Sequence, residues 1–206
     1  MRSTVSASAQ AESRNRLPVV LVHGIWNTAA IFNPLKRYLE SVGWTVYTFS
    51  MTPNNGDAPI ELLAEQVSTF VQGAIAPQQS FHLIGFSMGG LISRYYVQRL
   101  GGLDRIKTFI TISTPHRGTL LALSSRRPGI RQMRPGSRFL TELNRDIDGL
   151  RGCSFYTLWT PFDLLILPPW SSIVGLGKTQ RLCIASHNQM IRDTKGLAAI
   201  DSVLSA

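Results

Sequence analysis

The chain has 206 residues, of which 44% are hydrophobic, and it carries a formal net charge of +9. This length and composition fit one globular domain with a sizeable core. No apolar run approaches the length of a membrane span, which argues against a membrane-spanning protein. The basic charge comes without a zinc-finger, RNP or helix-turn-helix motif, so the sequence argues against nucleic acid as a partner.

The first sixteen residues are rich in Ser, Ala and Arg. We therefore expect a flexible tail at 1–16 and one domain at 17–206. No secretory apolar segment is evident, which favours a cytoplasmic or peripheral membrane location. Cys153 and Cys183 match neither a disulfide framework nor a metal-ligand spacing, and a single bridge between them stays open. The sequence predicts no metal and no cofactor, and it leaves the oligomeric state open.

Strand and helix patterns alternate along the domain. Short apolar or β-branched runs predict six strands, at 18–24, 44–49, 81–85, 105–113, 154–160 and 181–186. Helical spacing of apolar residues predicts helices at 28–43, with Thr28 as the N-cap, and at 60–74, 88–101 and 196–204. This alternation predicts an α/β fold, with a mostly parallel sheet of about six strands and helices on both faces.

The stretch "GFSMG" lies between a predicted strand and a predicted helix. It fits the pattern G-x-S-x-G, in which a serine occupies a sharp turn from strand to helix. Gly85 and Gly89 remove side chains that would collide across this turn, and the strained backbone presents the hydroxyl of Ser87. A flexible loop would not need glycines at this symmetric spacing. We therefore interpret Ser87 as a nucleophile.

A serine hydroxyl needs a general base. Of the four histidines, His23 and His82 precede the serine, and they fit a loop-shaping role and a core position respectively. His116 follows the next strand and comes too early in the chain to be the base. His187 follows the last predicted strand, where the base of this architecture is expected.

The base needs an acid to orient it. Asp163 directly follows a predicted strand and lies among apolar residues, where a carboxylate needs a partner. The other candidates lie in polar surroundings typical of solvated charges: Asp104, Asp146, Asp148 and Asp193. The order Ser87, Asp163, His187 is that of nucleophile, acid and base.

Attack by the serine creates an oxyanion, which two backbone N–H groups are expected to bind. Met88 directly follows Ser87 and starts the predicted helix. Ile25 lies in the loop after the first strand and is the second candidate donor, with Trp26 as the alternative. Trp26, Phe86 and His116 are the candidates for substrate contact.

Five motifs occur in matching order from Pro18 to the C-terminus: "PVVLVHGIW", "LIGFSMGGL", "STPHRGT", the aspartate of "TPFDLLILP" and the "SH" of "IASHNQM". Together they resemble the α/β-hydrolase lipases, above all the small bacterial-type triacylglycerol lipases and esterases. The resemblance implies the α/β-hydrolase fold and hydrolysis of lipid or acyl esters through an acyl-enzyme on Ser87. One position departs, because Phe86 stands where these lipases commonly have histidine. "GFS" also occurs in thioesterase-like members, so the leaving group stays open.

The segment 117–151 joins two predicted strands and has no strand pattern of its own. Its leucines lie among arginines, and seven arginines occur from Arg126 to Arg151. A lid that touches acyl chains and a connector with two packed helices both fit this pattern. The arginines fit a solvated surface, and they also fit a face toward an anionic membrane. The apolar stretch 164–170, with Ile173 and Val174, fits both the lining of an acyl pocket and core packing beside Asp163, and we expect core packing for most of it.

Two functions besides ester hydrolysis remain open. An acyltransferase or a thioesterase would use the same three residues. A catalytically silent binding protein with this fold is the other alternative, against which the complete set of Ser87, Asp163 and His187 argues.

Overall fold

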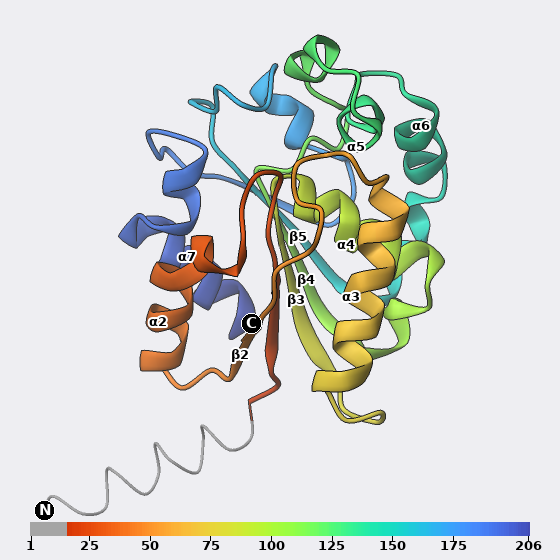
Figure 1. Ribbon diagram of the computed structural model, residues 1–206. Coiled ribbons are helices and arrows are strands. Elements are labelled where there is room, and N and C mark those ends of the chain that lie inside the picture. The colour runs from red at the N-terminus through yellow and green to blue at the C-terminus, as the bar shows by residue number, and fades with distance from the viewer. Residues whose placement is uncertain (1–15) are drawn as a thin grey trace, which may run out of the picture.

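The computed structural model describes residues 16–206, so all of the expected tail except Arg16 lies outside the described residues (Figure 1). Six strands form one sheet in the order β2-β1-β3-β4-β5-β6, and every neighbouring pair is parallel. The strands are β1 Val19–Val22, β2 Val46–Thr48, β3 Phe81–Phe86, β4 Ile106–Ile112, β5 Ser154–Trp159 and β6 Lys178–Arg181. The predicted α/β fold with a parallel sheet of about six strands is confirmed.

Helices cover both faces of the sheet (Figure 1). One face carries α2 (Asn33–Ser41) and α7 (Thr194–Leu204), and the other carries α3 (Ile60–Ala74) and α4 (Met88–Arg99). Two short helices, α5 (Pro128–Gln132) and α6 (Arg138–Arg145), lie near the carboxyl ends of the strands. The 3₁₀ helices are η1 Ala29–Phe32, η2 Gly102–Arg105, η3 Leu120–Ser124, η4 Ile147–Gly152, η5 Pro169–Ser172 and η6 Asn188–Ile191.

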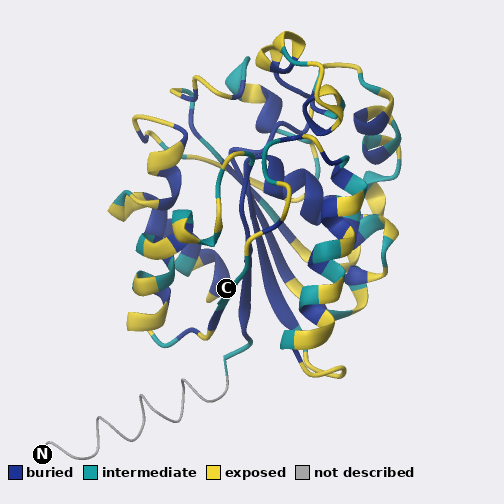
Figure 2. Cartoon of the chain, in the orientation of Figure 1, coloured by how far each residue is buried: buried dark blue, intermediate teal, exposed yellow. Residues whose placement is uncertain are grey.

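Burial on both faces explains why the strands are continuously apolar. Val20 and Val22 of β1 belong to the cluster with α3 and α4, whereas Val19 and Leu21 belong to the cluster with α2 and α7. Successive side chains of a strand point to opposite faces, so a sheet covered on both sides needs an apolar residue at every position. Figure 2 shows the resulting buried sheet between helices whose outer sides are exposed.

The predicted start of the first helix, at residue 28, is wrong. Residues 29–32 form η1, and α2 begins only at Asn33 with Pro34 in its first turn. Proline lacks the N–H that a continuous helix from 28 would need at this position. Thr28 precedes η1, but its side chain makes no capping hydrogen bond. Gly43, with φ +93°, does follow the end of the helix as predicted.

The last predicted strand is displaced. The sequence favoured 181–186, but β6 pairs with β5 through residues 178–181, with Lys178 opposite Tyr156. All four residues of β6 are exposed, because the strand forms the edge of the sheet. The apolar residues that suggested a strand, Leu182 and Ile184, pack into the cluster with α7 instead.

The apolar stretch 164–170 does not lie mostly in the core. Ile166 is buried, but Leu164 and Trp170 are 76% and 61% exposed. Cys153 and Cys183 are both free thiols, and burial raises the pKa of Cys153 to about 11. No helix within residues 16–206 has the length and apolar character needed to cross a bilayer.

The turn between β3 and α4 is the tightest part of the fold. Ser87 has φ +58°, a left-handed conformation that costs a non-glycine residue free energy. A Cβ on Gly85 would lie 2.5 Å from Cα of Gly90, so the turn closes only with glycine there. A Cβ on Gly89 would overlap the carbonyl oxygen of Val22, so this glycine also lets α4 approach β1.

We predict that Gly89→Val lowers the free energy of unfolding by about 1–3 kcal/mol, because the new side chain overpacks α4 against β1. Gly73→Val is the control: no atom lies within 4 Å of a Cβ built on Gly73 in α3, and the change in stability should stay within about 0.5 kcal/mol. Urea denaturation of both variants measures the difference. Equal stabilities would mean that α4 does not need the close approach.

Candidate active site

A cavity of about 290 Å³ opens at the carboxyl end of the sheet, and Ser87 and His187 both line it. The remaining lining is mainly apolar and comes largely from loops and from the 117–151 segment: Ile25, Leu121, Ala122, Ile130, Met133, Leu165 and Ile166. Both polar side chains are nearly buried. The cavity therefore offers an apolar ligand direct contact with a hydroxyl and an imidazole.

Asp163 holds the imidazole of His187 from the side away from solvent. The distance from His187 Nδ1 to Asp163 Oδ2 is 2.7 Å. The second carboxylate oxygen accepts hydrogen bonds from the backbone N–H groups of Leu165 at 2.9 Å and Ile166 at 3.0 Å. Burial by itself raises the pKa of Asp163, but His187 and the two backbone donors outweigh it and keep the pKa below its usual value. Asp163 therefore stays ionised while it is hydrogen-bonded to His187.

The loops that carry the acid and the histidine are tied together. Thr160 Oγ1, in the loop after β5, donates to the carbonyl oxygen of Ile184 at 2.6 Å, in the loop after β6. Phe86 supports the imidazole from the sheet, with 4.7 Å between the ring centroids of Phe86 and His187. The structure thus brings together Ser87, Asp163 and His187, which the sequence placed 76 and 24 residues apart.

The loop after β1 is fixed by two polar residues. His23 Nε2 accepts from the N–H of Met51 at 2.9 Å, which leaves Nδ1 as the donor to the carbonyl oxygen of Gly24 at 2.9 Å. This is the predicted loop-shaping role of His23. The N–H of Trp26 donates to Asn54 O at 2.6 Å, so it is occupied and does not face the cavity as a free donor. Ile25 remains the candidate donor of this loop.

The second candidate donor, Met88, is the first residue of α4. The first N–H groups of a helix have no partner within the helix, and the helix dipole makes its start favourable for negative charge. Gly24 lies directly against Ser87, since a Cβ on Gly24 would be 2.8 Å from Cβ of Ser87. The loop of Ile25 and the start of α4 therefore meet at the serine.

Two of the three residues expected to touch substrate do not line the cavity. Trp26 does line it and is 67% exposed. Phe86 and His116 are fully buried. Phe86 packs under His187, as described above, and the reason for the burial of His116 is a separate hydrogen-bond network.

That network centres on Arg94, a fully buried residue of α4. Its guanidinium donates to Leu143 O at 2.9 Å and Asn144 Oδ1 at 2.8 Å, both in α6, and lies 3.2 Å from His116 Nδ1. Asn144 Nδ2 in turn donates to the carbonyl oxygen of His116 at 2.9 Å. Arg94 therefore fastens the 117–151 segment to the helix that starts at the serine.

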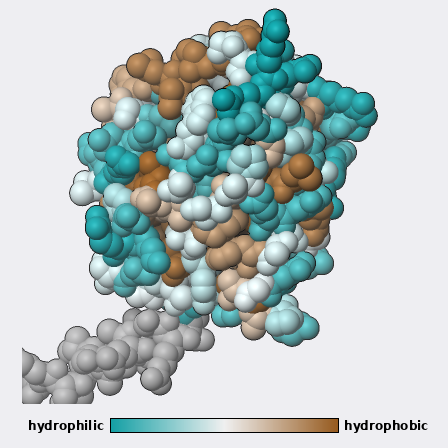
Figure 3. Space-filling model, in the orientation of Figure 1, coloured by the Kyte–Doolittle hydropathy of each residue, from teal (hydrophilic) through white to brown (hydrophobic). Residues whose placement is uncertain are grey.

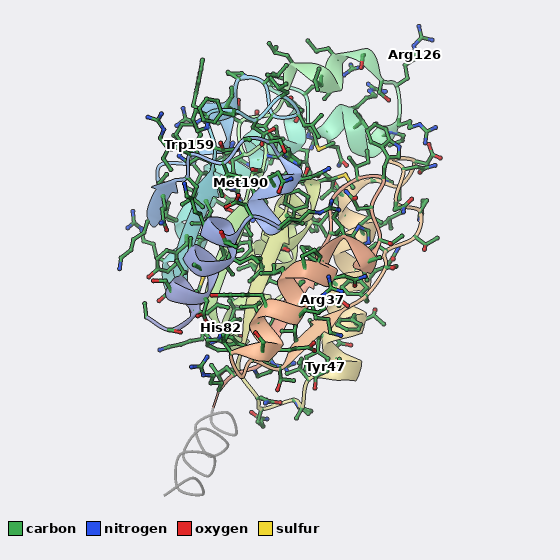
Figure 4. All side chains as sticks on the ribbon, turned by 90° about the vertical axis from the view of Figure 1, so that its left-hand side faces the viewer. Arg37, Tyr47, His82, Arg126, Trp159 and Met190 are labelled. Carbon is green, nitrogen blue, oxygen red and sulfur yellow. The ribbon has the colours of Figure 1, made fainter. Side chains whose placement is uncertain are left out.

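Burial sets the charge states in this network. It lowers the pKa of Arg94 to about 9, with a further contribution from Arg99, so the guanidinium stays charged at neutral pH. Burial and the nearby Arg94 charge also hold the pKa of His116 well below its usual value. His116 is therefore a neutral acceptor. His82, the remaining histidine, lies at the far end of the sheet (Figure 4), where burial lowers its pKa to about 4.

Sequence reasoning missed Asn54 and Arg94. Asn54 lies in a polar turn and carries no signal of a contact with residue 26. Arg94 had a usable signal, because it follows Gly90 and Leu91 by one helical turn and so falls on the buried face of α4. Within residues 16–206, no three His, Cys, Asp or Glu side chains converge as a metal site requires.

The sheet order, with a strained serine between β3 and α4, defines the class of protein: this is an α/β-hydrolase. A family model described as palmitoyl protein thioesterase matches residues 18–160, and the chain belongs to that family. The resemblance to lipases and esterases that the motifs suggested is confirmed as well. The family model and the motifs therefore agree on a hydrolase. The family model is named for thioesters, whereas the motifs resemble enzymes named for oxygen esters.

Curated relatives carry both names. Palmitoyl-protein thioesterase 3 of Dictyostelium discoideum is 32% identical over 106 residues, which is 49% of this chain and 36% of the relative. Triacylglycerol lipase of Burkholderia plantarii is 31% identical over 128 residues, 58% of this chain and 35% of the relative. The alignments thus span about a third of the length of these relatives.

Solved structures match over more of the chain. The mature lipase BlEst2 of Bacillus licheniformis has a TM-score of 0.74 at 14% identity, and the match covers 92% of each chain. Lipase B of Aspergillus fumigatus has a TM-score of 0.78 at 19% identity, over 94% of this chain and 53% of that one. At these identities the likeness establishes the fold alone.

We predict that Arg94→Met lowers the free energy of unfolding by about 3 kcal/mol, because it leaves the buried acceptor His116 Nδ1 without this donor and removes one of the two donors to Leu143 O, which keeps Gln98 Nε2. Arg99→Ala is the control on the same helix. Arg99 pairs with Asp146 in a partly exposed position, so its loss should cost less than about 1 kcal/mol. Thermal denaturation compares the two, and equal losses would contradict a special role for the buried guanidinium.

Proposed function

We propose that the protein hydrolyses esters of apolar acyl chains, with Ser87 as nucleophile, His187 as general base and Asp163 as the acid that orients it. The buried pair of Asp163 and His187, in the same apolar cavity as the strained serine, is the observation that carries this proposal. A binding protein without catalysis would have no need for a buried carboxylate that orients the imidazole of His187, because burying that charge is costly.

The geometry assigns each proton. Asp163 occupies Nδ1 of His187, so Nε2 is the atom that takes the proton from Ser87 Oγ as this oxygen attacks the ester carbonyl carbon. The backbone N–H groups of Ile25 and Met88 stabilise the oxyanion. His187 then gives the proton to the leaving oxygen or sulfur as its bond to the acyl carbon breaks. Water, activated by the same imidazole, releases the acid from Ser87.

The cavity supports an acyl chain as the bound group. Its walls from α5 and the loop after β5 are aliphatic, and no Lys, Arg, Asp or Glu side chain lines the cavity within the described residues. The cavity does not identify the leaving group, since this group departs toward solvent. A thioester is the second candidate substrate, because the family model and the Dictyostelium relative are named as palmitoyl thioesterases.

We predict that Ser87→Ala and His187→Ala each lower kcat/KM on an activated ester by about four to six orders of magnitude, without loss of fold. Asp163→Asn should cost about a thousandfold, since a misoriented imidazole still acts as a base. Asp146→Asn is the control, because Asp146 is half-exposed and pairs with Arg99. Ester hydrolysis by each variant, with circular dichroism as the check on folding, is the measurement. Near-normal activity of Ser87→Ala would remove the nucleophile from the proposal.

The leaving group can be identified with matched substrates. An oxoester and a thioester of the same acyl chain, tested over a range of chain lengths, give two sets of kcat/KM values. A preference for the thioester at every length would assign the thioesterase reaction, and the reverse would assign the lipase or esterase reaction. Addition of an alcohol as acyl acceptor, with product analysis, distinguishes transfer from hydrolysis.

We further propose contact between the 117–151 segment and an anionic membrane surface. Several of its arginines are occupied: Arg127 pairs with Asp57, Arg138 pairs with Glu142, and Arg134 donates to backbone carbonyls. No carboxylate among the described residues pairs with Arg126 or Arg131. Arg126 projects away from the body of the protein (Figure 4). These two arginines carry the charge that is free to meet an anionic lipid.

The double variant Arg126→Gln/Arg131→Gln should bind anionic vesicles more weakly, by about thirtyfold, since each arginine contributes about 1 kcal/mol near an anionic surface. Raising the ionic strength should weaken wild-type binding in the same direction. Arg37→Gln/Lys107→Gln removes the same charge elsewhere and serves as control. If both double variants lose affinity equally, net charge alone explains the attraction and the segment has no special role.

A further inference from the structure

Large hydrophobic side chains on the surface gather around the cavity. Ten are exposed among the described residues, and eight of these lie on segments that line or adjoin the cavity. Three of the eight, Trp26, Leu121 and Leu165, line it directly. The other five form what we call the apolar collar: Leu120, Leu123, Phe162, Leu164 and Trp170, each more than half exposed.

The two segments that carry the collar lie side by side, because they are hydrogen-bonded to each other. The N–H of Leu120 donates to Leu167 O at 2.8 Å. Thr119 Oγ1 donates to Leu165 O and accepts from the N–H of Leu167, both at 2.9 Å. Figure 3 shows hydrophobic residues gathered at the end of the molecule where Figure 1 places the 117–151 segment. Apolar surface concentrated in this way usually marks a site of contact with a protein or a membrane.

We propose that the apolar collar docks into a lipid surface, so that the cavity opens directly onto the membrane. The inference rests on the proposed hydrolysis of acyl esters, because a permanently bound protein on the collar would close the cavity to substrate. Exposed Trp26 and Trp170 have the side chain that is enriched at membrane interfaces. Arg126 and Arg131, on the loop and helix that follow Leu123, add positive charge beside the collar.

Docking does not have to open a lid. The helix α5, which supplies Ile130 to the cavity and is followed directly by the cavity residue Met133, is fastened to the body of the protein by hydrogen bonds. The N–H of Gly129 donates to Gly56 O at 2.9 Å, and a Cβ on Gly129 would lie 2.5 Å from Ala58 O. Gln132 accepts from the N–H of Ile60 at 2.7 Å. Because the cavity is already accessible with α5 in place, the collar should affect delivery of a lipid substrate and not turnover of a soluble ester.

The test uses the double variant Leu164→Ser/Trp170→Ser, whose side chains belong to the collar and do not line the cavity. Leu62→Ser/Val42→Ser is the matched control, because it removes the two exposed hydrophobic side chains that lie outside this region, on α3 and after α2. Cosedimentation with phosphatidylcholine vesicles, with and without phosphatidylserine, measures binding. We expect a loss of at least about tenfold for the collar variant and no loss for the control. Both should hydrolyse a soluble short-chain ester as the wild type does.

Three results would overturn the proposal: no binding of the wild type to either vesicle, equal binding by the collar variant, or a dimer of the wild type that the collar substitutions dissociate. The last would assign the collar to a second copy of the chain. Ser87→Ala separates this proposal from the proposed function, since it should bind vesicles normally while hydrolysing nothing. Vesicle binding by a wild type that cleaves no ester would leave the collar in place and remove the reaction.

Discussion

The close approach of α4 to the end of β1 is the constraint on which the site depends. Gly89 lets the first turn of α4 contact the carbonyl oxygens of Val22 and His23, and Gly24 lets the following loop contact Ser87. The unfavourable φ of Ser87 persists because its N–H is held by Ile112 O at 2.8 Å and its neighbours leave no alternative path. The same contact brings the loop of Ile25 and the start of α4 together at Ser87, so the proposed nucleophile and its two proposed donors would be positioned by one packing arrangement.

Two buried charges flank this arrangement, and the fold accommodates them differently. Asp163 has a cationic or hydrogen-bonding partner in His187 and two backbone donors, which together stabilise its ionised form. Arg94 has no carboxylate partner in the described residues; its acceptors are a backbone carbonyl, two amide side chains and a neutral imidazole. Neutral acceptors do not cancel its charge, so removal of any one of them leaves a buried donor unpaired. The Asp163 network fixes the loop after β5, which lines the cavity, and the Arg94 network fixes α6 against α4.

The sequence predicted what depends on local spacing and chain order. The strand–helix alternation gave the parallel sheet, the two glycines of "GFSMG" gave the turn at Ser87, and chain order selected Asp163 and His187, which the structure brings together. It failed where tertiary contacts decide. The edge strand β6 has four exposed residues and no apolar pattern, so 182–186 was the more strand-like segment. His116 and Phe86 are separated from the cavity by side chains that sequence spacing does not locate. The stretch 164–170 was expected inside because it is apolar, although only Ile166 is buried.

The exposure of 164–170 and the ionisation of Asp163 are linked through one loop. The N–H groups of Leu165 and Ile166 donate to Asp163. The carbonyl oxygen of Leu165 accepts from the Thr119 hydroxyl, and that of Leu167 accepts from the N–H of Leu120. The backbone N–H and carbonyl groups of this loop are therefore hydrogen-bonded to Asp163 on one side and to residues 119–120 on the other. Its side chains point into the cavity, as Leu165 and Ile166 do, or outward, as Leu164 does. A loop held in this way cannot swing open without releasing the acid. If the proposed docking is correct, contact of the apolar collar with lipid would therefore position the cavity at the membrane without rearranging Asp163 and His187.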